Sequence, residues 1–257
     1  SRGLGDVYKR QLIWQEQTAH QKKFHQLPSK IWYRMIAPLF LRKVRQIIPR
    51  SKRACDFTKS YLHNVTDTVL DHGINVDKFT FSSEKTRTII SSSQLIARKN
   101  INGIIRVFSA FTQMEGYEDI RLLIAGRGDQ RPMLESLAAE LGVREKVEFL
   151  GFLPQTELNQ YIKTSYCFLV NTRQDLNMVS IPEAVVSGTP ILTNTQPASA
   201  GYIRANRLGI VKDHWNEYDL KKIIDENPVF VQNCIAYRDN LTNTHIARTF
   251  LEIYRNK

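Results

Sequence analysis

The sequence predicts an α/β fold in which a parallel β-sheet is covered by helices on both faces. From residue 87 onward, short apolar segments alternate with segments whose apolar residues recur at helical spacing. The apolar segments are continuous runs, such as IRLLIAG at residues 120–126, rather than alternations of apolar and polar residues. Continuous runs are typical of strands buried on both sheet faces, and alternation of strand and helix favours parallel pairing.

The expected elements follow one another along the chain. Strands are expected over residues 87–93, 120–126, 146–152, 166–170, 189–194 and 209–211. Helices are expected over residues 101–114, 131–142, 156–165 and 181–187. A sheet of this kind binds ligands beyond the carboxyl ends of its strands. The residues that follow the strands are therefore the ones to examine for function: 93–94, 126–128, 151–152, 171–177 and 194–196.

The chain before residue 83 has a different character. Residues 1–11, SRGLGDVYKRQ, resemble a translated sequencing adapter; the alternative is a genuine flexible N-terminus, and they are left out of the fold prediction. Residues 29–62 are expected to form two helices broken around Pro49, and residues 65–79 a short strand and then a turn. The expected divisions of the chain are 1–11, 12–82, 83–244 and 245–257, the last an amphipathic terminal helix.

Charge is unevenly distributed along the chain. There are 36 Lys and Arg residues against 25 Asp and Glu, a formal net charge of +11, and no acid lies between Glu16 and Asp56. Aromatic and apolar residues such as Trp32 and Phe40 interleave with the basic residues of this segment. This pattern favours contact with an anionic membrane surface; the alternative is a helix with a core face and a solvated basic face. Nucleic acid is not an expected partner, because no recognition motif accompanies the charge.

Composition excludes several classes of protein. No run of about 18 apolar residues occurs, so no transmembrane helix is expected. The three cysteines, Cys55, Cys167 and Cys234, lie far apart in the sequence. Their spacing favours a reducing compartment and predicts no metal site.

Two short motifs after predicted strands could bind phosphate. Gly126-x-Gly128 follows a strand and precedes a helix, where glycines let a ligand approach the backbone and the helix N-terminus favours an anion. The alternative is a tight turn, since the third glycine and the acid of a dinucleotide-binding motif are absent. Lys99 follows the first strand and could neutralise a diphosphate; taken alone, its position favours the alternative, a solvated loop lysine.

Glu183 lies within an apolar run, and two interpretations compete for its carboxylate. Ser180-Ile181-Pro182-Glu183 matches a capping box, in which the serine hydroxyl and the glutamate side chain each bind a backbone N–H group of the first turn. In the other interpretation the carboxylate accepts hydrogen bonds from sugar hydroxyls in a cleft. Asp175 lies in the loop after a strand, where an acid often serves solvation alone.

Taken in order, these motifs resemble those of bacterial glycosyltransferases of the group 1 type (family 4). The motifs are QLIARKN (94–100), IAGRG (124–128), FLGF (149–152) and DLNMVSIPEAVVSGTP (175–190). Members of that family have two Rossmann-like domains in the GT-B arrangement. The resemblance implies that residues 83–244 are the nucleotide-sugar-binding domain and that residues 12–82 are a helical remnant of the acceptor-side domain with the interdomain segment. It therefore implies an N-terminally truncated chain.

The resemblance implies a retaining transfer of a sugar from a UDP- or GDP-linked donor to a glycan or lipid-linked acceptor, as in capsule or exopolysaccharide assembly. Two catalytic residues are implied: Asp175 would contact the donor sugar, and Lys99 would stabilise charge on the leaving diphosphate. Glu183 would hold the ribose. The remaining donor-binding residues implied are Gln94, Gly126, Arg127, Gly128, Asn177, Met178 and Val179. No cofactor and no metal are implied, and the sequence has no Asp-x-Asp motif. The implied location is cytoplasmic, at the membrane face.

The chain departs from the family pattern at three places. Asp175 replaces a glutamate, Gln94 replaces an arginine, and Leu176-Asn177-Met178 replaces a more usual Gly-Phe-Gly. These changes leave two alternatives open: a sugar-nucleotide epimerase of the same architecture, and a non-catalytic protein that binds nucleotide sugars.

Overall fold

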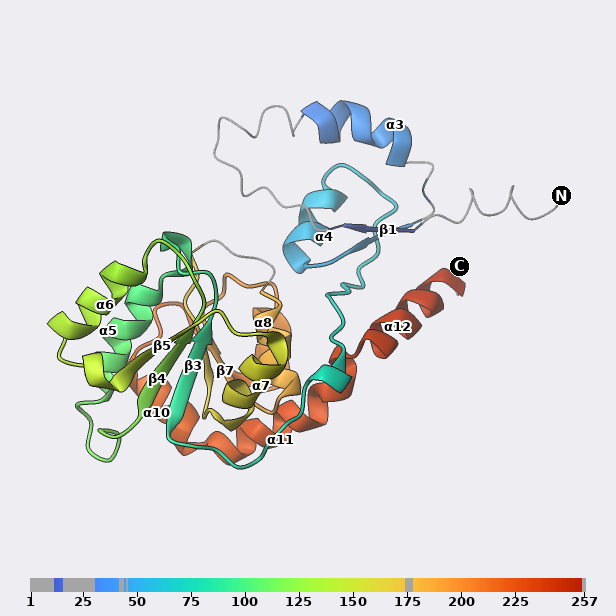
Figure 1. The fold of residues 1–257 in the computed structure, drawn as a ribbon. Helices are drawn as coiled ribbons and strands as arrows, with labels where there is room; N and C mark the ends of the chain where they lie inside the picture. Colours follow the sequence, from blue (N-terminus) through green and yellow to red (C-terminus); the bar gives the residue numbers. More distant parts are fainter. Residues whose placement is uncertain (1–11, 16–30, 42–43, 45, 174–177, 256–257) are drawn as a thin grey trace. The chain divides into compact units, whose positions relative to one another are not determined.

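The computed structural model describes residues 12–15, 31–41, 44, 46–173 and 178–255 (Figure 1). The chain divides into two units, with residues 74–243 in one unit and residues on either side of them in the other. Residues 74–82, which the sequence places before a boundary at 83, therefore belong to the sheet-bearing unit. Among the described helices, none combines the length and the apolarity needed to cross a bilayer.

The unit of residues 74–243 contains a six-stranded sheet in the order β5-β4-β3-β6-β7-β8, and all its strands are parallel. The parallel α/β fold predicted from the sequence is confirmed. The strands are β3 (Thr88–Ser92), β4 (Arg121–Ala125), β5 (Val147–Gly151), β6 (Phe168–Val170), β7 (Ile191–Thr193) and β8 (Gly209–Val211). Each lies within a predicted range.

Helices cover both faces of this sheet (Figure 1). Those of the unit are α5 (Ile101–Phe111), α6 (Arg131–Glu140), α7 (Gln155–Thr164), α8 (Ser180–Val186), α9 (Ala200–Ala205), α10 (Glu217–Asp225) and α11 (Asn227–Tyr237). The last three lie outside the helices predicted from the sequence. For α10 a signal was present, because Asn216 and Asp219 form a capping box.

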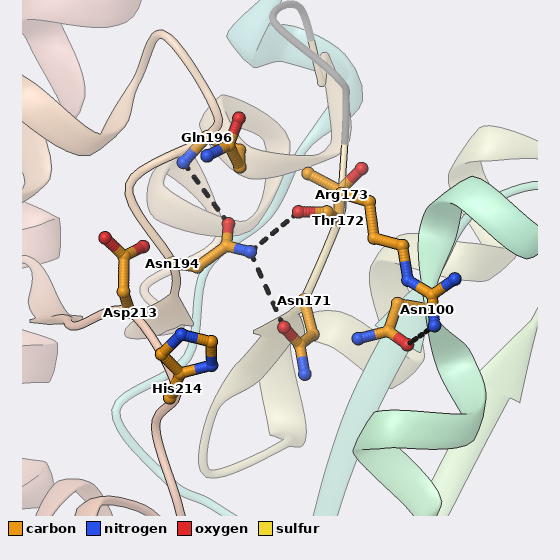
Figure 2. Close-up of a pocket in the computed structure, with 8 residues that line it drawn as sticks. All are labelled: Asn100, Asn171, Thr172, Arg173, Asn194, Gln196, Asp213 and His214. Atoms are coloured by element: carbon orange, nitrogen blue, oxygen red, sulfur yellow. Dashed lines mark hydrogen bonds between the residues drawn. The ribbon is translucent and has the colours of Figure 1, made fainter.

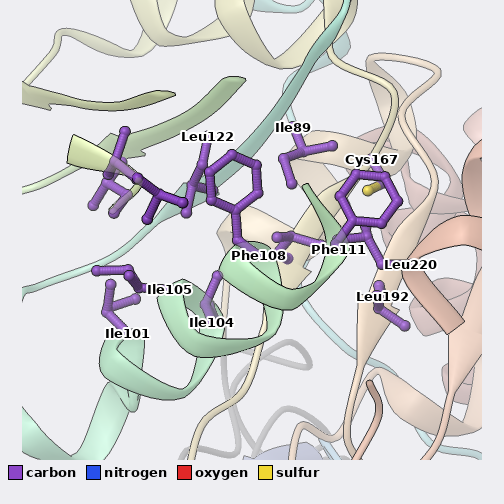
Figure 3. Close-up of a cluster of buried hydrophobic side chains, with 14 of the residues drawn as sticks. Ile89, Ile101, Ile104, Ile105, Phe108, Phe111, Leu122, Cys167, Leu192 and Leu220 are labelled. Carbon is purple, nitrogen blue, oxygen red and sulfur yellow. The ribbon is translucent and has the colours of Figure 1, made fainter. Parts of the chain in front are cut away.

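Alternation along the strands divides the core into two layers. Ile89 and Leu122 belong to the layer under α5, α6 and α10, whereas Ile90 and Leu123 belong to the layer with α7, α8 and α9. Figure 3 shows Phe108 and other α5 side chains packed against the first layer. Phe108 is fully buried, and truncation of such a side chain to alanine typically costs about 3–5 kcal/mol. The two layers hold the strand ends, and hence the loops after them, in place.

The other unit corrects the prediction of a purely helical remnant. Strand β1 (Leu12–Gln15) pairs in parallel with β2 (Gln46–Pro49), so Pro49 ends a strand instead of breaking a helix. Pro at a strand end costs little, because the missing N–H is not needed there. The helical parts are the five-residue π-turn η3 (Trp32–Ile36), α3 (Ala37–Leu41), α4 (Lys52–Lys59) and the predicted terminal helix, α12 (Asn243–Arg255).

Residues 65–79 form no continuous strand. Val65 makes an isolated parallel bridge with Ile47, and Ile74 makes another with Thr242. Arg238 then fixes the segment that enters the sheet-bearing unit, since its guanidinium donates to the carbonyls of Val76 and Phe79.

Candidate functional site

The strand order places the candidate site between β3 and β6. The chain runs from β3 outward to β4 and β5, and then crosses back to β6 on the other side of β3. Such a reversal opens a crevice beyond the carboxyl ends of the two strands, because their loops leave in opposite directions. The loops after β3 and β6 carry Lys99 and Asp175 respectively.

Hydrogen bonds join these two loops. The backbone N–H of Arg173 donates to Arg98 O at 2.8 Å, and Thr172 Oγ1 donates to the same carbonyl at 3.2 Å. The Arg173 guanidinium donates to Asn100 Oδ1 at 3.1 Å. The crevice therefore has one wall made from both loops rather than two independent segments.

Lys99 ends a single 3₁₀ turn, Ala97–Lys99, immediately before α5, and its side chain is partly buried. The next residue, Asn100, has the left-handed conformation, with φ 54° and ψ 40°. Asparagine adopts this conformation more readily than other residues with a side chain, and the resembling family has glycine here. The substitution thus keeps the turn that presents Lys99.

Backbone packing explains why both Gly126 and Gly128 are glycines. A Cβ on Gly126 would lie 1.8 Å from Ser93 O, and one on Gly128 would lie 2.2 Å from Leu95 O. The loop after β4 is held against the loop after β3 by hydrogen bonds such as Leu95 N to Arg127 O, 2.9 Å. Close backbone packing therefore requires both glycines, and phosphate binding by this loop remains a prediction.

Arg127 and Gln94 are exposed near these glycines. The Arg127 guanidinium lies over the ring of Phe152, 5.6 Å from its centroid. Phe152 follows β5 and is itself 66% exposed. The pair forms a flat cation–π surface on loops at the carboxyl edge of the sheet, where a planar ligand could stack.

Glu183 does not form a capping box, and this alternative is wrong. Helix α8 begins at Ser180, so Ser180 lies inside the helix, and the N-cap position falls on Val179, which makes no side-chain cap. The Glu183 carboxylate instead accepts a hydrogen bond from Gln155 Nε2 at 2.6 Å. Sequence reasoning missed Gln155, which is the first residue of helix α7 and has an exposed side chain.

Burial governs the chemistry of Glu183. Glu183 is only 8% exposed, and residues 181–186 of α8 are all buried. Burial raises the pKa of the Glu183 carboxyl, and the hydrogen bond from Gln155 partly opposes this rise. A buried carboxylate has unfilled acceptor capacity, so it is suited to bind hydroxyl groups of a ligand that excludes water.

The remaining predicted residues are only partly described. Met178 is buried in the second core layer, whereas Val179 is 43% exposed. Asp175 and Asn177 lie outside the described residues. No group of three or more His, Cys, Asp or Glu residues in the described part of the chain could hold a metal ion.

A cavity of about 430 Å³ lies at the carboxyl ends of β6, β7 and β8 (Figure 2). Its lining comprises Asn100, Asn171, Thr172, Arg173, Asn194, Gln196, Asp213 and His214. None of the described residues that the sequence singled out for donor binding lines it. Residues 171–173, 194 and 196 are among the strand-end positions predicted from the sequence. Asp213 and His214, which follow β8 in the same way, were missed.

Long-range contacts fix the β8 loop beside the cavity. Trp215 is 3% exposed, and its indole N–H donates to Val170 O, the last residue of β6, at 3.1 Å. Asp213 Oδ1 accepts hydrogen bonds from the backbone N–H and the hydroxyl of Thr195, at 3.0 and 2.8 Å. These hydrogen bonds lower the pKa of the Asp213 carboxyl.

Comparisons with known proteins agree with this architecture. Over 215 residues the chain is 24% identical to alpha-monoglucosyldiacylglycerol synthase of Streptococcus pneumoniae, an alignment that covers 77% of this chain and 47% of the relative. Over 109 residues it is 30% identical to the uncharacterized glycosyltransferase MJ1607 of Methanocaldococcus jannaschii, covering 42% of this chain and 27% of the relative. The chain spans about half the length, or less, of these relatives.

Solved structures show the same fold. Anabaena Alr3699/HepE in complex with UDP superposes with a TM-score of 0.76 at 14% identity, covering 96% of this chain and 73% of that one. The family described as glycosyl transferases group 1 matches residues 75–227, which include β3 to α10 and every loop of the candidate site. The chain therefore belongs to the group 1 family of glycosyl transferases.

Proposed function

We propose that this chain is the donor-binding part of a retaining glycosyltransferase that moves a sugar from a nucleotide sugar to a glycan or a lipid-linked acceptor. The observation that carries the proposal is the buried Glu183 carboxylate, held by Gln155 on a helix that follows the switch-point loop. Its unfilled acceptor capacity matches the vicinal hydroxyls of a ribose. Solved structures with this fold include complexes of Anabaena HepE with UDP.

The other residues take roles that fit their positions. The exposed Arg127–Phe152 pair offers a stacking surface for the base of the nucleotide. Lys99, supported by the backbone around Met178 and Val179, neutralises the diphosphate as the bond to the sugar breaks. From the family resemblance alone, Asp175 contacts the donor sugar and Asn177 belongs to the donor site. Gln94 supplies a neutral hydrogen bond where that family has a cation. Side chains and backbone provide this stabilisation, without a metal.

Calorimetry with UDP, UDP-glucose and GDP-mannose tests the assignment. We expect binding by the native chain and at least a tenfold loss with Glu183→Ala, because a charged hydrogen bond typically contributes about 1.5–3 kcal/mol. Glu157→Ala, an exposed acid on α7, is the matched control. Undiminished affinity in a folded Glu183→Ala protein would remove Glu183 from the site.

We further propose that the acceptor is reached at the cytoplasmic face of an anionic membrane. The η3–α3 segment exposes six large apolar side chains by 37–65%: Ile31, Trp32, Met35, Ile36, Leu39 and Phe40. Their spacing places them along one face of the segment, and Arg34 is exposed between them. Two relatives are named alpha-monoglucosyldiacylglycerol synthase, a name that contains a lipid product.

Flotation with lipid vesicles tests this surface. We expect the chain to bind vesicles containing phosphatidylglycerol and not vesicles of phosphatidylcholine alone, with weaker binding at high salt. Leu39→Ser should weaken binding several-fold, whereas Leu251→Ser, an exposed leucine on α12, should not. Equal binding by the two variants would refute the assignment of η3–α3 as the lipid-binding surface.

A further inference from the structure

The cavity at the ends of β6, β7 and β8 contains three asparagine amides whose orientations are fixed by their neighbours. Asn194 Nδ2 donates to Thr172 O at 2.7 Å, and a carbonyl can only accept, so the Asn194 amide has one orientation. That NH₂ group also approaches Asn171 Oδ1 at 3.5 Å, which turns Asn171 Nδ2 away from it. Arg173 donates to Asn100 Oδ1, and this turns Asn100 Nδ2 away as well.

The NH₂ groups of Asn100 and Asn171 lie near one another beside the start of α5 (Figure 2). No described residue accepts a hydrogen bond from Asn100 Nδ2 or from Asn171 Nδ2. They converge over the first turn of α5 at Gly103, because a Cβ there would lie 2.7 Å from Asn100 Nδ2 and 3.0 Å from Asn171 Nδ2. Glycine inside a helix costs stability relative to alanine, and here it leaves room for both amides.

The rim of the cavity adds groups of other kinds. Asp213 and His214 follow β8 and are exposed, and no described residue is hydrogen-bonded to the His214 ring. His214 has φ 54°, the left-handed conformation, which histidine adopts more readily than most residues with a side chain. A backbone conformation of this kind persists where surrounding contacts hold it. The buried Trp215 next to it supplies such a contact.

The chemistry of the lining selects the ligand. No aliphatic side chain is among the lining residues of the described chain, so this lining favours a ligand that makes hydrogen bonds over an acyl chain. Arg173 and Asp213 have opposite charges, so the cavity does not select strongly for an anion. Amide donors, a carboxylate and an imidazole around one space fit a neutral ligand with many hydroxyls.

We propose that this cavity binds a pyranose ring, and that Asp213 and His214 read the arrangement of its hydroxyls. The inference rests on the proposed function for the identity of the sugar, which is the glycosyl group of the donor. Asn100 directly follows Lys99, and Arg173 lies two residues before Asp175, so the cavity is bounded by the neighbours of both proposed catalytic residues. An acceptor sugar has the same chemistry and is the other source of such a ring.

Gly103→Ala is the decisive variant. The new methyl group displaces both amides, whereas the higher helix propensity of alanine does not weaken α5. Gly201→Ala is the matched control, since Gly201 also lies in a helix and a Cβ there meets nothing within 4 Å. Circular dichroism and thermal unfolding confirm that both variants are folded.

Calorimetry then compares UDP with UDP-glucose, UDP-galactose and UDP-N-acetylglucosamine, and GDP with GDP-mannose. We expect the native chain to bind one nucleotide sugar about tenfold more tightly than its nucleotide, and Gly103→Ala to abolish this difference while leaving nucleotide affinity unchanged. Asp213→Asn should reduce the preference between UDP-glucose and its C4 epimer UDP-galactose. If Gly103→Ala keeps the native preference, the cavity is not a sugar site, although the proposed function stands.

Saturation-transfer NMR with methyl α-glucopyranoside and methyl α-galactopyranoside separates the two sources. Signals that Gly103→Ala removes and that excess nucleotide sugar displaces assign the cavity to the donor sugar. Signals that Gly103→Ala removes but nucleotide sugar does not displace assign it to an acceptor. If the native chain binds no nucleotide but the pyranoside signals persist, the proposed function is overturned and the pyranose site is not. Absence of both kinds of binding overturns the pyranose assignment.

Discussion

Replacing Glu183 with glutamine should stabilise the protein and weaken nucleotide binding at the same time. Glutamine has nearly the same shape as glutamate, and its carbonyl can still accept the hydrogen bond from Gln155 Nε2. The substitution therefore removes the buried charge and replaces one acceptor oxygen with an NH₂ group. A residue retained only for stability would not show these opposite effects.

The magnitude follows from the environment of the carboxylate. Glu183 is 8% exposed, and Gln155 is the one described residue that hydrogen-bonds to its carboxylate. Leaving a buried charged group incompletely satisfied costs about 1–3 kcal/mol, so Glu183→Gln should regain about 1 kcal/mol at neutral pH. In a protein of this size, that gain raises Tm by about 2–4 °C.

The sign of the pH dependence follows from the raised pKa of Glu183. Burial places its folded-state pKa above the ordinary value of 4.5, so the folded protein binds this proton more readily than the unfolded chain does. Between these two pKa values stability therefore falls as pH rises, and the cost is fully present above the folded-state pKa. Glu183→Gln should remove this slope.

Urea denaturation from pH 4.5 to 8 and calorimetry with UDP measure the two effects. We expect a higher free energy of unfolding for Glu183→Gln at pH 7.5, with affinity for UDP at least tenfold lower, because an amide cannot replace both acceptor oxygens. Glu157→Gln should change neither quantity much. A Glu183→Gln protein that is less stable and binds UDP normally would refute the reasoning.

Three further predictions concern the scaffold and the chemistry. Lys85 donates to the carbonyls of Lys163 and Gly188, so Lys85→Met should cost about 1–3 kcal/mol in urea denaturation at pH 7. Burial also lowers the pKa of Lys85 to about 8 from 10.5. The free energy of unfolding should therefore increase as pH rises from about 8 to 10.5, and this increase should vanish in Lys85→Met. Gly126→Ala brings a methyl group against Ser93 O and should cost about 2–5 kcal/mol, seen as a lower Tm than the native chain. Dialysis against EDTA should leave UDP affinity in calorimetry unchanged; a loss that Mg²⁺ restores would contradict the proposed metal-free site.

Prediction from sequence succeeded for elements whose pattern is contained in adjacent residues. It failed for elements that are short or that depend on a partner distant in the sequence. Strands such as residues 120–126 were found because a continuous apolar run is a property of adjacent residues. Strand β2 was missed because its four residues, ending in Pro49, resemble a helix break when its parallel partner β1 is unknown. The N-cap of α8 was misplaced by one residue, a shift that local pattern seldom resolves.

The sequence by itself determined the fold class, the order of the strands along the chain, the family resemblance and the edge of the sheet to examine. The tertiary structure alone decided which groups meet at that edge. It paired Glu183 with Gln155, 28 residues away, and joined loops from β3, β6, β7 and β8 into one cavity. The physical reason is that periodicity and turn chemistry are encoded in neighbouring residues. Burial and hydrogen-bond partners depend instead on contacts between distant segments, which exist only once the sheet has formed.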